Sequence, residues 1–228
     1  MKKDTVLVWD LPTRVFHWLL AASFIGAFLT AESERLRAVH VTLGYTMLGL
    51  VAFRLLWGLV GTRYARFSAF TFGPGRVLGY VKSLFTRSPQ HYVGHNPAGS
   101  WAIYALLGLT AAAGLTGYAT YNDIGGEWFE ELHEAVANAL LAVVLVHVAG
   151  VAVSSLLHRE NLVRSMIDGL KAGAPGDGIR YQHYIVAVAL AAGVVGFWTG
   201  GGDYVAAIAG GDTGPAAAIG RLAHEERD

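Results

Sequence analysis

Four histidines stand out because each falls within or at the mouth of a long apolar segment: His17, His40, His133 and His147. Ionisable side chains are costly inside a membrane and are usually functional there. A histidine can bind a metal through a ring nitrogen or relay a proton. The chain contains no cysteine, which excludes disulfides, iron–sulfur clusters, Cys-ligated zinc and the C-x-x-C-H attachment of c-type haem. Histidine is therefore the strongest candidate metal ligand.

The spacing of these histidines predicts two matched pairs. His133 and His147 are 14 residues apart in one predicted helix, which corresponds to a rotation about 40° short of four full turns and a rise of ~21 Å. One helix thus presents two imidazoles on one face, near opposite sides of a membrane. His17 is expected at the depth of His147, and His40 at the depth of His133. Two histidines at equal depth on facing helices are what a bis-His haem b requires, so we expect two such sites stacked across the bilayer.

Arginines repeat beside two of these histidines. Arg14 precedes His17 by three residues, as Arg37 precedes His40, and residues at this spacing share a helix face. Each arginine lies one turn nearer its membrane surface, where its charge and fork geometry suit an anionic haem propionate. Arg54, 14 residues after His40, is expected near the site of His17 and His147. The competing interpretation is that each histidine is a hydrogen-bonded core residue, but matched pairs and a repeated spacing argue against coincidence.

The elements that must position these residues are membrane-spanning helices. Hydrophobic residues make up 54% of the 228 residues and charged residues only 15%, against about 25% in ordinary soluble domains. A spanning helix needs about 20 mostly apolar residues. Such runs occur at 13–31, 38–60, 101–121 and 133–156, with a shorter fifth run at 183–199. We expect an all-α integral membrane fold, a four-helix bundle with a fifth transmembrane helix.

Small residues and a further amphipathic segment complete the predicted bundle. Residues 74–87 are expected to form an amphipathic helix at the membrane interface. Glycines where a haem or a neighbouring helix could approach are Gly44, Gly108, Gly114 and Gly117. The net charge is zero, so the chain lacks the excess of basic residues that is typical of nucleic-acid-binding proteins. No nucleic-acid partner is expected.

Charge distribution predicts the topology. The N-terminal segment, the 61–100 loop and the 157–182 segment hold twelve basic residues, whereas the opposite side holds only four. By the positive-inside rule the N-terminus is cytoplasmic and, with five spans, the C-terminus is outside. The expected organisation is a transmembrane domain over 1–172, a linker and fifth span over 173–199, and a flexible extramembrane tail over 200–228.

Several motifs together resemble the bacterial di-haem cytochrome b561 family, which includes the cytochrome b subunits of nickel–iron hydrogenases. They are RVFHW (14–18), YARFS (64–68), GHNP (94–97), HE (133–134) and LHRENLVR (157–164), and the resemblance covers about residues 5–172. It implies a four-helix bundle in the bacterial inner membrane, with two b haems and ligands from spans one, two and four. Carried over, it assigns His17 and His147 to the inner haem and His40 and His133 to the outer haem.

The resemblance also implies a function. Such a protein transfers electrons across the bilayer between the quinone/quinol pool and a redox partner, which would be a periplasmic c-type cytochrome or a dehydrogenase or hydrogenase subunit. This describes an electron-transfer subunit better than a stand-alone enzyme. His95 and Asn96 are candidates for quinone or propionate binding, although Asn96 followed by proline also suits a plain helix cap.

Two other functions remain open at this point. One is superoxide:quinone oxidoreductase activity at the outer face, with which Arg35 and Arg37 are compatible. The other is a haem-free transporter that uses the histidines as proton relays. A relay does not need histidines matched in depth, so the pairing favours a cytochrome.

Overall fold

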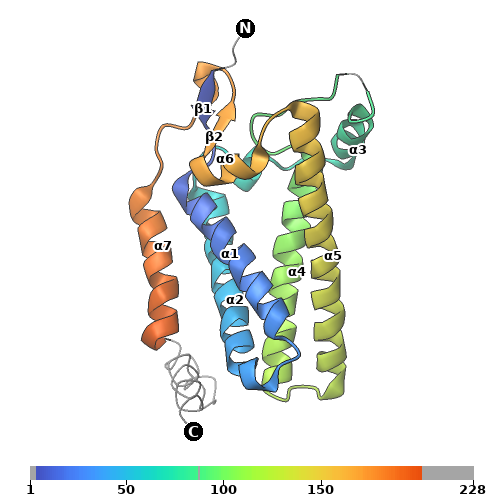
Figure 1. Cartoon of the computed structure of the whole chain (residues 1–228), viewed down its shortest axis with the longest axis vertical. Helices are drawn as coiled ribbons and strands as arrows, with labels where there is room; N and C mark the ends of the chain where they lie inside the picture. The colour runs from blue at the N-terminus through green and yellow to red at the C-terminus, as the bar shows by residue number, and fades with distance from the viewer. Residues whose placement is uncertain (1–3, 87, 202–228) are drawn as a thin grey trace.

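Four long helices dominate the computed structural model, which describes residues 4–86 and 88–201 (Figure 1). They are α1 (Leu11–Thr30), α2 (Arg37–Val60), α4 (Pro97–Tyr121) and α5 (Glu127–His158). All four are long and apolar enough to cross a membrane. The predicted all-α membrane bundle is therefore confirmed. Helix α5 begins six residues before the predicted span, because the acidic residues of its first turn favour a helix N-terminus.

Pairwise packing of neighbouring helices builds the bundle. Helix α1 packs on α2, α2 on α4, and α4 most extensively on α5. Two apolar clusters fill the interior, one around Phe16, Leu50 and Leu107 and the other around Met47 and Leu140. Many large apolar side chains point outward instead; examples are Leu29, Leu59, Val146 and Leu156. Such an outward apolar surface is expected where lipid surrounds the helices.

One end of the bundle carries additional short elements and is called the α3 end below (top of Figure 1). They are α3 (Pro74–Ser83), α6 (Leu162–Asp168), β1 (Thr5–Leu7), β2 (Leu170–Ala172) and the single turns η2 (Phe67–Ala69) and η3 (Pro175–Asp177). The strands pair antiparallel with Val6 opposite Lys171. The strands were not predicted, and α3 ends at Ser83, before the predicted limit of residue 87.

The opposite end is called the turn end, because short connections join α1 to α2 and α4 to α5 there (Figure 1). The first connection contains the turn η1 (Glu34–Leu36). Helices α1 and α4 therefore run from the α3 end to the turn end, and α2 and α5 run back. This alternation brings the start of α2 and the start of α5 to the same end of the bundle.

A buried carboxylate ties the start of α1 to the end of α2. Asp10 is 1% exposed, and its Oδ1 accepts a hydrogen bond from the Thr13 backbone N–H, capping α1. Its Oδ2 accepts from Trp57 Nε1 at 3.1 Å and from Thr62 Oγ1 at 2.7 Å. All three donors thus depend on one side chain at the α3 end.

The last described helix is α7 (Tyr184–Gly196), continued by the π-helical segment η4 (Phe197–Gly201). It packs along α1, and Trp198 Nε1 donates to Thr46 Oγ1 of α2 at 3.0 Å. Its α-helical part has 13 residues, fewer than the ~20 of a typical span, so the fifth span over 183–199 stays a prediction. The predicted tail over 200–228 lies, after its first two residues, outside the described residues.

Candidate functional site

His40 and His133 lie together at the turn end. Their ring centroids are 6.1 Å apart and the ring planes are perpendicular. His40 Nδ1 lies 2.8 Å from the Ala27 carbonyl oxygen of α1, and His133 Nδ1 lies 3.0 Å from the Ala113 carbonyl oxygen of α4. A carbonyl oxygen only accepts, so each Nδ1 carries the proton. In the neutral ring, Nε2 then has the free lone pair with which histidine binds a metal.

The separation of these two rings fits a metal ion bound between them. Metal–imidazole bonds are about 2.0–2.1 Å and each ring centre lies about 1.1 Å beyond its nitrogen, so two imidazoles on opposite sides of one metal ion would have centroids about 6.3 Å apart. The observed distance is 6.1 Å. Gly117 of α4 makes this position of His133 possible, because a Cβ at residue 117 would lie only 2.9 Å from His133 Cε1.

His17 and His147 form a second pair toward the α3 end. His17 lies in the second turn of α1, and His147 lies three turns before the end of α5. The two imidazoles are near enough to interact electrostatically. His17 Nδ1 is buried and has no hydrogen-bond partner among the described residues. As expected from the helical rise, His133 and His147 on the same helix place the two pairs ~21 Å apart along the bundle.

Arg54 and His95 lie close together at the α3 end. Arg54 is 3% exposed, and its guanidinium carbon lies 4.8 Å from the ring centre of Phe67. The His95 ring packs between Trp9 and Phe70, at centroid distances of 4.6 and 4.3 Å. Arg54 Nη1 and His95 Nδ1 are buried without hydrogen-bond partners in the part of the chain that the structure describes. Burial lowers the pKa of His95 to about 3, so its imidazole is neutral at physiological pH.

The other predicted polar residues have protein partners. Arg14 donates from its two terminal nitrogens to the Ile167 carbonyl and to Gln182 Oε1. Arg37 is exposed and pairs with Glu34. Arg14 Nε is nevertheless buried without a hydrogen-bond partner among the described residues, so the two arginines of the repeated spacing are not equivalent.

Asn96 acts as a helix cap. Its Oδ1 accepts a hydrogen bond from the Gly99 N–H at 2.7 Å at the start of α4. Of the four candidate glycines, Gly114 faces Leu48 of α2, whereas an added Cβ at Gly44 or Gly108 would meet no atom within 4 Å. Gly44 lies one turn after His40, so open space adjoins the pair at the turn end.

A cavity of about 250 Å³ opens beside His95. Four aromatic residues, Tyr64, Phe70, Phe72 and Tyr92, line it together with the charged residues Arg63 and Asp177, and it is called the aromatic cavity below. A Cβ at Gly94 would lie 2.5 Å from Tyr64, so glycine is needed at that point of the wall. Sequence analysis missed this cavity, although the density of aromatic residues between residues 64 and 92 was a visible signal.

No group of three or more His, Asp or Glu side chains suited to a metal ion occurs within 4–86 and 88–201. Among the long apolar helices, the candidate metal-binding positions that we consider are the two histidine pairs. Each pair offers two nitrogen donors from facing helices. This donor set matches the axial ligation of a b haem, whose other four ligands come from the macrocycle itself.

Comparison with known proteins shows which family the chain resembles over most of its length. Residues 8–169 match the family described as prokaryotic cytochrome b561. The probable Ni/Fe-hydrogenase B-type cytochrome subunit of Rhizobium leguminosarum bv. viciae is 24% identical over 215 residues, covering 74% of this chain and 90% of the relative. Its counterpart in Azotobacter chroococcum mcd 1 is 26% identical over 216 residues, covering 74% and 89%. No solved structure matches the chain significantly.

Proposed function

Because the chain belongs to the prokaryotic cytochrome b561 family, we propose that this multi-pass membrane b-type cytochrome holds two haem b groups and conducts electrons between its two ends. The observation that carries this proposal is the presence of two histidine pairs at opposite ends of one bundle. His17 and His147 would hold the haem nearer the α3 end, and His40 and His133 the haem nearer the turn end. Haem supplies the one-electron chemistry when bound.

The protein contributes ligand geometry, burial and local charge. The Nδ1 hydrogen bonds of His40 and His133 to helix carbonyls orient both rings and increase the basicity of the free nitrogens. Two histidine ligands to each haem would leave no position for oxygen to bind, which would favour electron transfer over oxygen chemistry. Arg54, with its open buried donor, is the best candidate to bind a propionate of the haem near the α3 end. Arg14, whose Nε is also buried without a partner among the described residues, is a second candidate, whereas Arg37, paired with Glu34, would act through its charge alone.

The redox partners are proposed from the chemistry and from the relatives. The α3 end carries most of the basic loops and would face the cytoplasm of a bacterial inner membrane. The aromatic cavity beside His95 is below the 300–1,000 Å³ of sites that enclose a whole drug-sized ligand, and it suits one planar ring such as a quinone headgroup. The relatives are named as hydrogenase subunits, so a hydrogenase or similar dehydrogenase is the partner that we propose, with a periplasmic c-type cytochrome as the alternative.

The test is haem content in single variants. In purified protein, a dithionite-reduced minus oxidised spectrum and a pyridine haemochrome assay should give two b haems per chain. His17→Ala and His147→Ala should lose one and the same haem, and His40→Ala and His133→Ala the other.

His183→Asn provides a control for these variants. His183 lies outside both pairs with a left-handed φ of 53°, which asparagine tolerates, so both haems should remain. Loss of the same haem in His17→Ala and His133→Ala would contradict the pairing. Absence of haem from folded protein made with haem available would contradict the cytochrome proposal and favour a transporter.

A further inference from the structure

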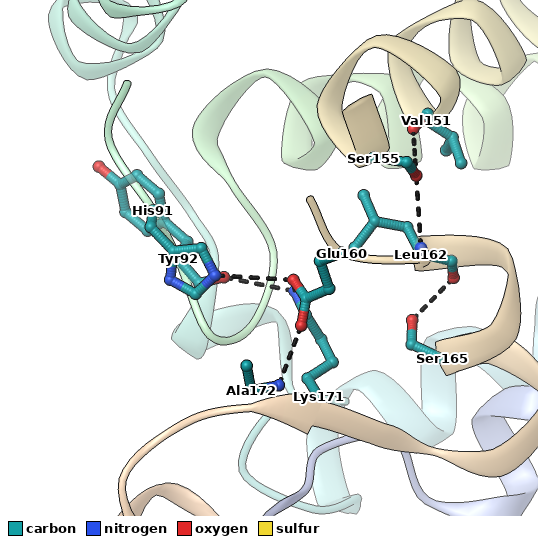
Figure 2. A network of polar contacts seen from close by, with 9 residues as sticks. All are labelled: His91, Tyr92, Val151, Ser155, Glu160, Leu162, Ser165, Lys171 and Ala172. Carbon is teal, nitrogen blue, oxygen red and sulfur yellow. Dashed lines mark hydrogen bonds and ion pairs between the residues drawn. The ribbon is translucent and has the colours of Figure 1, made fainter. Parts of the chain in front are cut away.

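A buried ion pair joins the segment just after α5, β2 and the 84–96 loop at the α3 end (Figure 2). Glu160 Oε2 lies 3.5 Å from Lys171 Nζ, and Glu160 Oε1 accepts a hydrogen bond from the Ala172 N–H at 2.9 Å. Lys171 Nζ also donates to the Tyr92 carbonyl at 3.3 Å. The two charged side chains are only 13% and 5% exposed. The pair is thus held by several elements and largely removed from water.

Such a pair is a weak source of stability, because the cost of removing two charges from water offsets most of their attraction. It is better suited to moving a proton. Burial lowers the pKa of the Lys171 ammonium, which brings it closer to a state in which it can release a proton. Glu160 beside it offers a carboxylate that can accept one.

Outward, the pair reaches the surface through histidine. His91 Nε2 lies 3.6 Å from Glu160 Oε2, and the His91 side chain is 29% exposed. Figure 2 shows His91 pointing toward the Glu160 carboxylate from the neighbouring loop. The His158 ring at the end of α5 lies 5.4 Å from the His91 ring. Histidine is the side chain that exchanges protons most readily near neutral pH.

Inward, the pair borders a small polar cavity of about 20 Å³, which also touches Tyr80, Asn96 and Ser154. This volume accommodates one water molecule, which needs about 10–15 Å³ and two to four polar partners. Ser154 follows His147 by seven residues, two helical turns along the same face of α5. The small cavity therefore lies on the side of α5 that carries the proposed haem ligand.

The small cavity and the aromatic cavity share part of their walls. Tyr92 and Gly94 line both cavities, and His95 follows directly in the sequence. Lys171 is close enough to interact electrostatically with His95. Polar groups thus run from the exposed edge of His91 through Glu160 and Lys171 to the small cavity, whose wall at Tyr92 and Gly94 is shared with the aromatic cavity.

We propose that Glu160, together with Lys171 and His91, carries protons between the water at the α3 end and a quinone bound in the aromatic cavity. This inference rests on the proposed function, which supplies the quinone. A quinol that becomes a quinone releases two electrons and two protons. Bound haem would take up the two electrons, and Glu160 would pass the two protons on to water. The reverse reaction takes up two protons by the same route.

The titratable and charged groups that surround Glu160 come from four elements: Lys171 of β2, His91 of the 84–96 loop, His158 of α5 and Tyr80 of α3. The competing explanation for this cluster is a static clamp that only holds the loop against α5. The two explanations differ in what happens when the carboxylate is replaced by a group of the same shape. If the cluster only holds the loop in place, this replacement leaves electron transfer unchanged. If the cluster is a proton path, the replacement removes the carboxylate that accepts the proton.

The experiment uses Glu160→Gln, which retains an oxygen to accept the Ala172 N–H. Stopped-flow spectroscopy follows haem reduction by a short-chain quinol in the purified full-length protein. We expect reduction at least about tenfold slower than in the parent, since a positioned proton acceptor typically contributes 10²–10⁴-fold. Added acetate, a small diffusible base, should restore much of the rate. Haem content and reduction by dithionite should not change.

The matched control is Arg164→Gln, which breaks an exposed ion pair with Asp168 on α6 at the same end. It should reduce at the parent rate. An unchanged quinol rate in Glu160→Gln overturns the inference. A slower rate that acetate does not restore, accompanied by shifted haem potentials, also overturns it and identifies a clamp. If the parent protein holds haem but no quinol reduces it, the quinone part of the proposed function is wrong. The inferred proton path is then wrong as well.

Discussion

Gly117→Ala should remove the haem at the turn end and spare the other. A Cβ at this position would lie 2.9 Å from His133 Cε1 and 3.2 Å from Nδ1. Carbon atoms in contact prefer about 3.5–4.0 Å, so the imidazole would have to retreat by about 0.6 Å or more. Its Nδ1 is held near the Ala113 carbonyl at 3.0 Å and Thr116 Oγ1 at 3.2 Å. The ring therefore cannot retreat without losing the contacts that orient it.

The expected loss of haem affinity follows from how little the ligand distances of a metal site can change. Ligand distances in such sites hold within about 0.2 Å, and disturbing the groups that orient a ligand typically costs 10–100-fold in metal affinity. We expect a loss of about that size for the haem of His40 and His133, measured as the haemochrome content after dialysis against a haem scavenger. Redox titration should show the remaining haem with its original potential.

Gly49→Ala is the matched control, because Gly49 is an exposed glycine of α2 whose added Cβ meets no atom within 4 Å. It should retain both haems. Two haems with unchanged potentials in Gly117→Ala would refute the reasoning, because they would mean that His133 does not need its observed position to bind iron.

Three further predictions concern the α3 end. Arg54→Gln should lower the potential of the haem near His17 by tens of millivolts in a redox titration, because it removes a buried positive charge that favours the reduced iron; an unchanged potential would exclude Arg54 as a neighbour of that haem. His95 is buried with its pKa lowered to about 3, so the unfolded chain binds more protons than the folded one below about pH 6.5, and stability falls with acidification. At pH 5 this effect lowers the free energy of unfolding by about 2 kcal/mol. The thermal midpoint in detergent should therefore fall less between pH 7 and 5 in His95→Gln than in the parent. Asp10→Ala leaves the Trp57 and Thr62 donors without their acceptor and should cost about 2–5 kcal/mol by the same thermal assay; Asp10→Asn should cost less, and equal losses would show that the acceptor oxygens are not the cause.

Helix geometry explains why much of the site could be predicted. An apolar run of about 20 residues forms a spanning helix almost regardless of its neighbours, because its backbone groups must be satisfied within the helix. The fixed rise of 1.5 Å per residue then gives the depth of each histidine. Four spans and two depth-matched histidine pairs followed from these local rules, and the structure brings His40 and His133 to 6.1 Å. That these residues bind haem iron stays a prediction.

Tertiary structure alone decided which partner each polar side chain takes. Arg14 and Arg37 share a spacing in the sequence, yet one donates to the Ile167 carbonyl and Gln182 and the other pairs with Glu34. The two environments differ because the segments that fold over the α3 end have no counterpart at the turn end. The pairing of β1 with β2 and the contact of Glu160 with His91 join residues far apart in the chain, and no periodicity encodes such contacts. Depth is a local property of one helix, whereas contacts depend on how separate elements rotate and pack against one another.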